Sequence, residues 1–131
     1  MTSRSHHSPL RVLAIEDSPE VRGFYGALLA EEGYAVKLAC NGEEGLSVLS
    51  WEPDVILLDL LLPVMDGYEF LRRLRASPDG QDVPVLVLSG SLSPTRMTVR
   101  GAQAVLRKPF DFGYLMRSIQ VLAMGGIAPS N

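Results

Sequence analysis

Mostly apolar runs of strand length alternate along this chain with segments in which apolar residues recur at helical spacing. The helical spacing is clear where Val21, Phe24 and Leu28 follow one another. The strand-like runs are Leu10–Ile15, Tyr34–Ala39, Asp54–Leu58, Val83–Leu88 and Ala104–Arg107. Strands that are apolar on both faces and separated by helices predict a parallel sheet with helices on both sides. We therefore expect an α/β fold, a doubly wound three-layer sandwich with five parallel strands.

Helix start and stop signals support this division of the chain. Ser18-Pro19 and Asn41-Gly42 are typical of helix starts, and so are Asp66-Gly67 and Asp111, while Gly33 is typical of a helix end. Ser93-Pro94 opens a further, brief helix that Gly101 ends. Each strand is thus followed by one helix.

Length and composition predict one domain with two short tails. The chain has 131 residues, of which 47% are hydrophobic, enough for one packed core. Residues 1–8 are polar and without periodicity, so we expect a disordered tail there, a domain over residues 9–126, and a C-terminal tail over 127–131.

Charge and cysteine content exclude several classes of protein. The net charge is −3 and no stretch is rich in Lys or Arg, which argues against binding to nucleic acid or to a membrane surface. No apolar run reaches the ~18 residues of a membrane span. Cys40 is the single cysteine, which excludes an internal disulfide and fits a reducing, cytoplasmic setting.

Polar side chains stand where four of the predicted strands end. Glu16 and Asp17 follow the first strand and Asp59 closes the third, while Ser89 and Lys108 follow the fourth and fifth. In a doubly wound sheet of order 2-1-3-4-5 the first and third strands are neighbours, and ligands bind in the crevice at their carboxyl ends. Three crowded carboxylates favour a divalent cation such as Mg²⁺, and Ser89 and Lys108 suit a phosphoryl group. Asp59, the sole acid at its strand end, is the economical choice of nucleophile.

These residues resemble the receiver domains of two-component response regulators. The matching pieces, in family order over Leu10 to about Met124, are Ile15–Pro19, Asp59–Gly67 with its D-x-x-x-P-x-M-D-G pattern, Leu88–Gly90 and Lys108–Phe110. The resemblance implies a flavodoxin-like or CheY-like fold. It also implies that Asp59 accepts a phosphoryl group from the phosphohistidine of a sensor histidine kinase or phosphotransfer protein.

The resemblance further implies a role for each site residue. Asp17 and Asp59 would bind Mg²⁺ together with the backbone carbonyl of Leu61, and Glu16 would act directly or through water. Ser89 would donate a hydrogen bond to the phosphoryl oxygens and Lys108 would pair with them, and the Lys108-Pro109 bond would be cis.

Two departures from the family pattern concern signalling. Many receivers carry Tyr or Phe three residues before the site lysine, where this chain has Val105. The stretch from Ser89 to Gly101 is also short, and the shortfall falls on the fourth helix. We hypothesise that the output surface is atypical and does not form the common fourth-helix dimer.

Three interpretations remain open at this point. The first is a phosphorylation switch that acts through an unknown downstream protein and is not a turnover enzyme. The second is a phosphorylation-independent interaction module with the same fold, favoured by Val105 and the short fourth helix. The third, a small hydrolase of the haloacid-dehalogenase type, would need an acid at Leu61.

Overall fold

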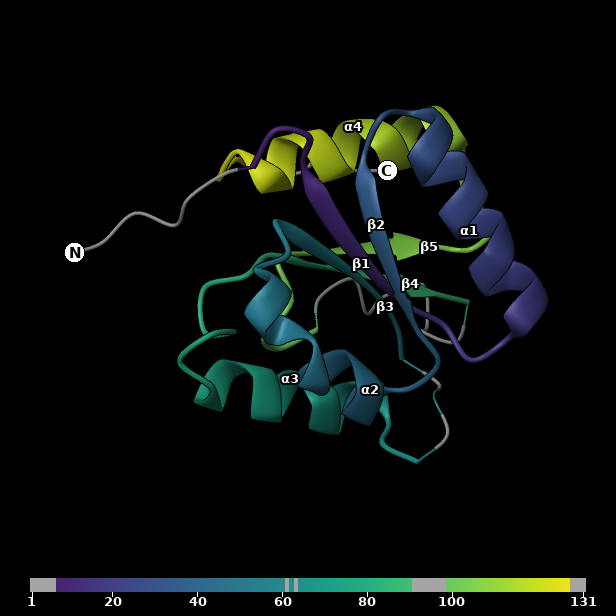
Figure 1. Ribbon diagram of the computed structural model, residues 1–131. Coiled ribbons are helices and arrows are strands. Elements are labelled where there is room, and N and C mark those ends of the chain that lie inside the picture. The colour runs from purple at the N-terminus through teal and green to yellow at the C-terminus, as the bar shows by residue number, and fades with distance from the viewer. Residues whose placement is uncertain (1–6, 61, 63, 91–98, 128–131) are drawn as a thin grey trace.

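A five-stranded parallel sheet forms the centre of the molecule (Figure 1). The structure, a computed structural model, describes residues 7–60, 62, 64–90 and 99–127. The strands are β1 (Arg11–Ile15), β2 (Ala35–Ala39), β3 (Val55–Asp59), β4 (Val85–Ser89) and β5 (Ala104–Arg107). Their order is β2-β1-β3-β4-β5, which confirms the predicted fold class and strand order.

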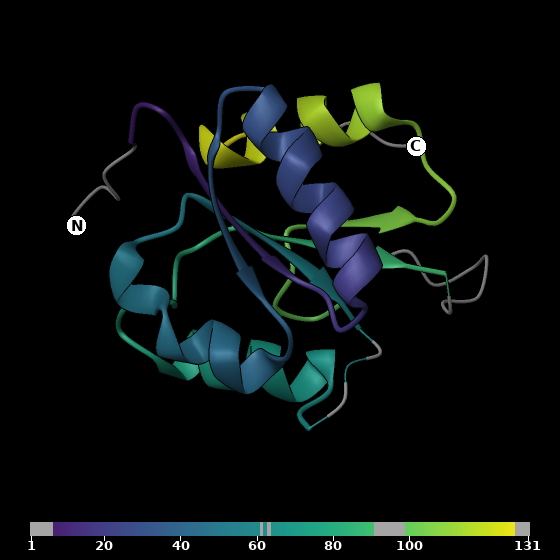
Figure 2. The same cartoon turned by 45° about the vertical axis from the view of Figure 1, so that its right-hand side comes forward.

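Helices cover both faces of the sheet (Figure 2). One face carries α1 (Pro19–Glu31) and α4 (Phe112–Ala123), and the other carries α2 (Gly42–Ser47) and α3 (Gly67–Ala76). A short 3-10 helix, Leu49–Trp51, follows α2. In the part of the chain that the structure describes, no helix is long and apolar enough to cross a membrane. The predicted short helix between Ser93 and Gly101 lies largely outside the described residues.

Side-chain caps fix where the helices begin. Each of the four α-helices starts after a residue whose side chain accepts a hydrogen bond from a backbone N–H of the first turn; these residues are Ser18, Asn41, Asp66 and Asp111. Such a bond satisfies one of the N–H groups that a helix start leaves without a partner. The sequence signals at these four positions are therefore confirmed.

Alternate residues of the buried strands pack on opposite faces of the sheet. In β1, Leu13 and Ile15 pack toward α2 and α3, whereas Val12 and Ala14 pack toward α1 and α4. All four are at most 2% exposed. This two-sided burial explains why the strand sequences are continuously apolar.

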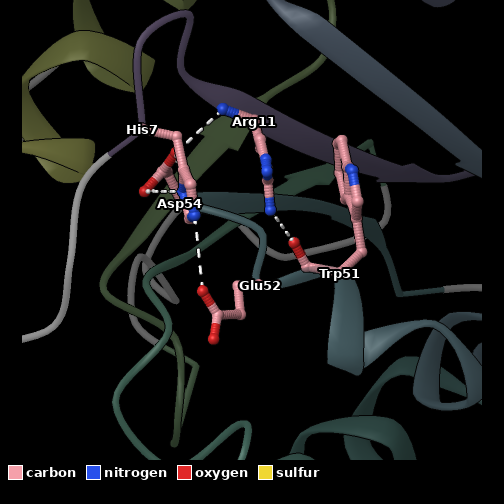
Figure 3. Close-up of polar contacts among 5 residues, drawn as sticks. All are labelled: His7, Arg11, Trp51, Glu52 and Asp54. Carbon is pink, nitrogen blue, oxygen red and sulfur yellow. Dashed lines mark hydrogen bonds and ion pairs between the residues drawn. The ribbon is translucent and has the colours of Figure 1, made fainter.

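The amino edge of the sheet holds a polar cluster around Asp54, directly before β3 (Figure 3). The Asp54 side chain is 0% exposed, and its carboxylate accepts a hydrogen bond of 2.8 Å from the backbone N–H of Arg11. The His7 ring lies with Nδ1 at 3.1 Å from Asp54 Oδ2 and Nε2 at 3.4 Å from Glu52 Oε1. The Arg11 guanidinium donates to the carbonyl of Trp51. His7, inside the predicted tail, thus contacts the sheet at the edge opposite the strand-end acids.

Candidate functional site

Three acidic side chains converge at the carboxyl edge of the sheet. Glu16 and Asp17 directly follow β1, and Asp59 is the last residue of β3. The two strands are hydrogen-bonded neighbours, with Ile15 paired to Leu58. One carboxylate oxygen from each of the three acids lies within 4.8 Å of the others. The register of two adjacent parallel strands therefore brings these sequence-predicted residues together.

The crowding of three carboxylates, one of them buried, makes this acidic cluster electrostatically costly in the absence of a cation. Glu16 is 4% exposed, and its carboxylate accepts a hydrogen bond of 3.0 Å from the backbone N–H of Ser18. Burial raises the pKa of the Glu16 carboxyl, and Asp17 and Asp59 raise it further, while the Ser18 bond and Lys108 act in the opposite direction. A hard divalent cation would favour the charged form of all three acids.

The donor set fits Mg²⁺. Only oxygen ligands are present in the cluster, and Asp17 is exposed, so a cation bound there would keep water ligands. The proposed third protein ligand, the carbonyl of Leu61, lies outside the described residues. Mg²⁺ at this position would be held by Asp17 and Asp59, with Glu16 beside it.

Lys108 brings a positive charge close to Asp59. It follows β5 directly, and its Nζ lies 3.4 Å from Asp59 Oδ2. Its backbone N–H donates a hydrogen bond of 3.1 Å to the carbonyl of Ser89, the last residue of β4. The Lys108-Pro109 bond is cis, as the resemblance implied. The Lys108 side chain is 33% exposed, so the amine can reach both Asp59 and a ligand from solvent.

Ser89 lies beside this pair. It is 2% exposed and pairs with Arg107 in the register of β4 and β5, one residue before Lys108. Asp59, the proposed phosphoacceptor, pairs with Leu88 of β4. Ser89 is the next residue of the same strand. The edge thus presents an acid cluster, a hydroxyl and an amine in strand order, which is a suitable arrangement for phosphoryl transfer.

The loop after Asp59 returns to the sheet through a close backbone contact. Gly67 donates a hydrogen bond of 2.9 Å to the carbonyl of Leu60, and a Cβ on Gly67 would lie 2.7 Å from Leu60 Cα. Asp66 caps α3, its carboxylate accepting from the N–H of Glu69 at 2.9 Å. The Asp-Gly pair therefore has a structural role, as its position before a helix predicted.

Arg22 contacts the loop of Glu16 and Asp17, and this contact was not predicted from the sequence. Its Nη1 donates to the carbonyl of Glu16 at 2.9 Å and to that of Asp17 at 3.2 Å. An arginine in the first two turns of a helix carries no signal of its own. A contact with the preceding loop could be suspected only from its place five residues after Asp17.

Comparisons with known proteins point to one family. A family model described as a response regulator receiver domain matches residues 12–120. The response regulator MprA of Mycolicibacterium vanbaalenii is 35% identical over 118 residues, which are 87% of this chain and 50% of that protein. MprA of Mycobacterium leprae is 36% identical over 117 residues, 86% of this chain and again 50% of the relative. The chain thus spans about half the length of these relatives.

Solved structures are similar in fold and in sequence. The receiver domain of the sensor histidine kinase PA1611 from Pseudomonas aeruginosa has a TM-score of 0.80 and 32% identity, and covers 88% of this chain and 98% of its own. That structure has a magnesium ion coordinated in its active site cleft. The chemotaxis protein CheY4 of Vibrio cholerae has a TM-score of 0.75 and 32% identity, over 85% of this chain and 96% of its own. The resemblance stated from the motifs is confirmed, and the chain belongs to the family of response regulator receiver domains.

Proposed function

We propose that this receiver domain is a phosphorylation switch whose phosphoacceptor is Asp59. The observation that carries the proposal is that Asp59 belongs to the acidic cluster and also lies 3.4 Å from the amine of Lys108. Its carboxylate is thus next to both a possible cation site and an ammonium group. Both positive charges would stabilise the negative charge of a transferring phosphoryl group.

The proposed step is transfer from a phosphohistidine to Asp59. A carboxylate oxygen of Asp59 forms a bond to phosphorus as the bond from phosphorus to the imidazole nitrogen breaks, and the imidazole leaves with the electron pair and takes up a proton. Mg²⁺, when bound, would neutralise charge on the phosphoryl oxygens. Lys108 would pair with those oxygens, and the Ser89 hydroxyl would donate a hydrogen bond to them. Water then hydrolyses the acyl phosphate and returns the carboxylate.

The partners of the proposal are a sensor histidine kinase or phosphotransfer protein upstream and a protein target downstream. The domain would assist its own phosphorylation and dephosphorylation and would not turn over an outside substrate. With its single cysteine, Cys40, it suits a reducing cytoplasm. The phosphorylation-independent alternative is not favoured, because the complete set of Asp17, Asp59 and Lys108 would then serve no purpose.

Intact mass after incubation with acetyl phosphate and Mg²⁺ tests the proposal. We expect the mass of one phosphoryl group to be added to the wild type and to be absent in Asp59→Asn. Asp66→Asn is the matched control, because Asn also caps helices and Asp66 should be unnecessary for phosphorylation. No added mass in the wild type would rule the mechanism out in favour of the phosphorylation-independent module. The same added mass in Asp59→Asn would rule out Asp59 as the phosphoacceptor.

A further inference from the structure

The loop that carries Glu16 and Asp17 is held by hydrogen bonds that come from three donor groups. The N–H of Glu16 donates to the carbonyl of Ala39 in β2 at 3.0 Å, and the N–H of Ser18 donates to the Glu16 carboxylate, also at 3.0 Å. The third anchor is Arg22, whose Nη1 reaches the carbonyls of Glu16 and Asp17. Neither of the first two anchors involves Asp17. Arg22 is therefore the anchor that holds the backbone of Asp17.

Asp17 needs such an anchor more than its neighbours do. Glu16 is buried and Asp59 is fixed by β3, whereas Asp17 is exposed on the loop. Its carboxylate lies near two others of the same charge, which favours its rotation toward solvent. Fixing the carbonyls of Glu16 and Asp17 fixes the peptide planes on which the direction of the Asp17 side chain depends.

The guanidinium of Arg22 does this without neutralising the acids. Within the described residues its side chain contacts carbonyl oxygens, and it forms no ion pair with Glu16, Asp17 or Asp59. Arg22 is itself fixed as part of α1, where its N–H donates to the carbonyl of Ser18 at 2.8 Å. The carboxylate oxygens thus stay available to a cation while the backbone behind them is held.

We propose that Arg22 is a positioning residue for the cation site: it presets the loop so that Asp17 faces Asp59 before Mg²⁺ arrives. The inference rests on the proposed function and extends it to a residue that does not touch the cation or the phosphoryl group. Groups that orient a metal ligand typically change metal affinity by roughly 10- to 100-fold when removed. We expect Arg22→Ala to weaken Mg²⁺ binding by about tenfold on this basis.

A purely electrostatic role of Arg22 predicts the opposite change in Mg²⁺ affinity. If Arg22 acted only as a nearby positive charge, its removal would tighten Mg²⁺ binding, because a repulsion would be lost. Arg22→Lys keeps the charge and one donor, and should recover part of the affinity. Arg73→Ala, on α3, is the matched control, since it removes the same charge and a side chain that, among the described residues, pairs with Glu69 alone.

The experiment is isothermal titration of each 131-residue variant with MgCl₂, followed by phosphorylation with acetyl phosphate. We expect weaker Mg²⁺ binding in Arg22→Ala, partial recovery in Arg22→Lys and wild-type affinity in Arg73→Ala. At saturating Mg²⁺ the phosphorylation rate of Arg22→Ala should return to nearly the wild-type rate, because Arg22 acts through the loop and not on the reacting atoms. Unchanged or tighter Mg²⁺ binding by Arg22→Ala would overturn the inference. A wild type that binds no Mg²⁺ would instead overturn the metal site itself, and this inference with it.

Discussion

Replacing Gly67 by alanine should destabilise the fold through a contact with the backbone beside Asp59. A Cβ at position 67 would lie 2.7 Å from Leu60 Cα, 2.8 Å from Leu60 Cδ2 and 3.2 Å from the carbonyl oxygen of Asp59. The nearest atom is backbone, so a rotation of the Leu60 side chain cannot relieve the overlap. The chain next to Asp59 must move, or α3 must shift away from the sheet.

The size of the effect follows from two opposing contributions. Overpacking a close contact costs about 1–3 kcal/mol. Alanine has the better helix propensity, but at the first residue of α3, outside the helix interior, this recovers only about 0.5 kcal/mol. We therefore expect a net loss of about 0.5–2.5 kcal/mol, and a fall in the unfolding temperature of about 4 °C for each kcal/mol in a domain of this size.

Gly23→Ala is the matched control, and it should raise the free energy of unfolding instead of lowering it. Gly23 lies inside α1, and a Cβ built there meets nothing within 4 Å. The same substitution should then stabilise the protein by about 0.5–1 kcal/mol through the unfolded chain and helix propensity. Urea unfolding of both variants, at fixed pH and without Mg²⁺, measures the two free energies. Equal stability of Gly67→Ala and the wild type would refute the steric argument.

Three other expected outcomes concern groups outside the acidic cluster. Burial raises the pKa of Tyr25 to about 12, and the nearby charges of Glu16 and Asp59 add to the rise. Because this lies above the unfolded value of 10.0, the stability that Tyr25 contributes is intact below pH 10 and lost as the pH rises toward 12; urea unfolding should show no such loss for Tyr25→Phe. Arg75→Lys should cost about 1–3 kcal/mol in urea unfolding, because an ammonium cannot replace the fork that donates to the Gly101 carbonyl through Nε and Nη2. His7→Ala should cost about 1 kcal/mol by thermal unfolding, since buried Asp54 loses a partner at 3.1 Å, whereas equal stability would mean that His7 does not hold Asp54.

The position of the acids and Lys108 was predictable because strand ends are visible in a sequence. A charge that closes an apolar run marks where a buried strand surfaces, as Asp59 does. Parallel strands place all such ends on one edge, so the order β2-β1-β3-β4-β5 decides which residues meet. Glu16, Asp17 and Asp59 converge for this reason, and no side-chain detail is needed to expect it.

The contacts that hold the site in shape were not predictable in the same way. Arg22 reaches two carbonyls, and the close approach of Gly67 depends on a distance to Leu60. Neither contact follows from a periodic pattern in the sequence, because each depends on how one loop passes one helix. The contact between His7 and Asp54 was hidden for a similar reason, since a polar segment without a pattern was interpreted as a tail.

The side chain of Val105 belongs to one particular face of the sheet. Its side chain packs on the α2 and α3 face, so the ring that many receivers carry at this position is missing from that face. On the other face, Phe110 follows Lys108 by two residues and packs toward α1 and α4. Phe110 contacts Phe112 with centroids 6.1 Å apart, and Phe112 contacts Phe24 of α1 at 5.3 Å. The segment that follows Lys108 therefore contacts α1. Arg22, which holds the acidic loop, belongs to the same helix. Helix α1 thus supports both the acidic loop and the segment after Lys108.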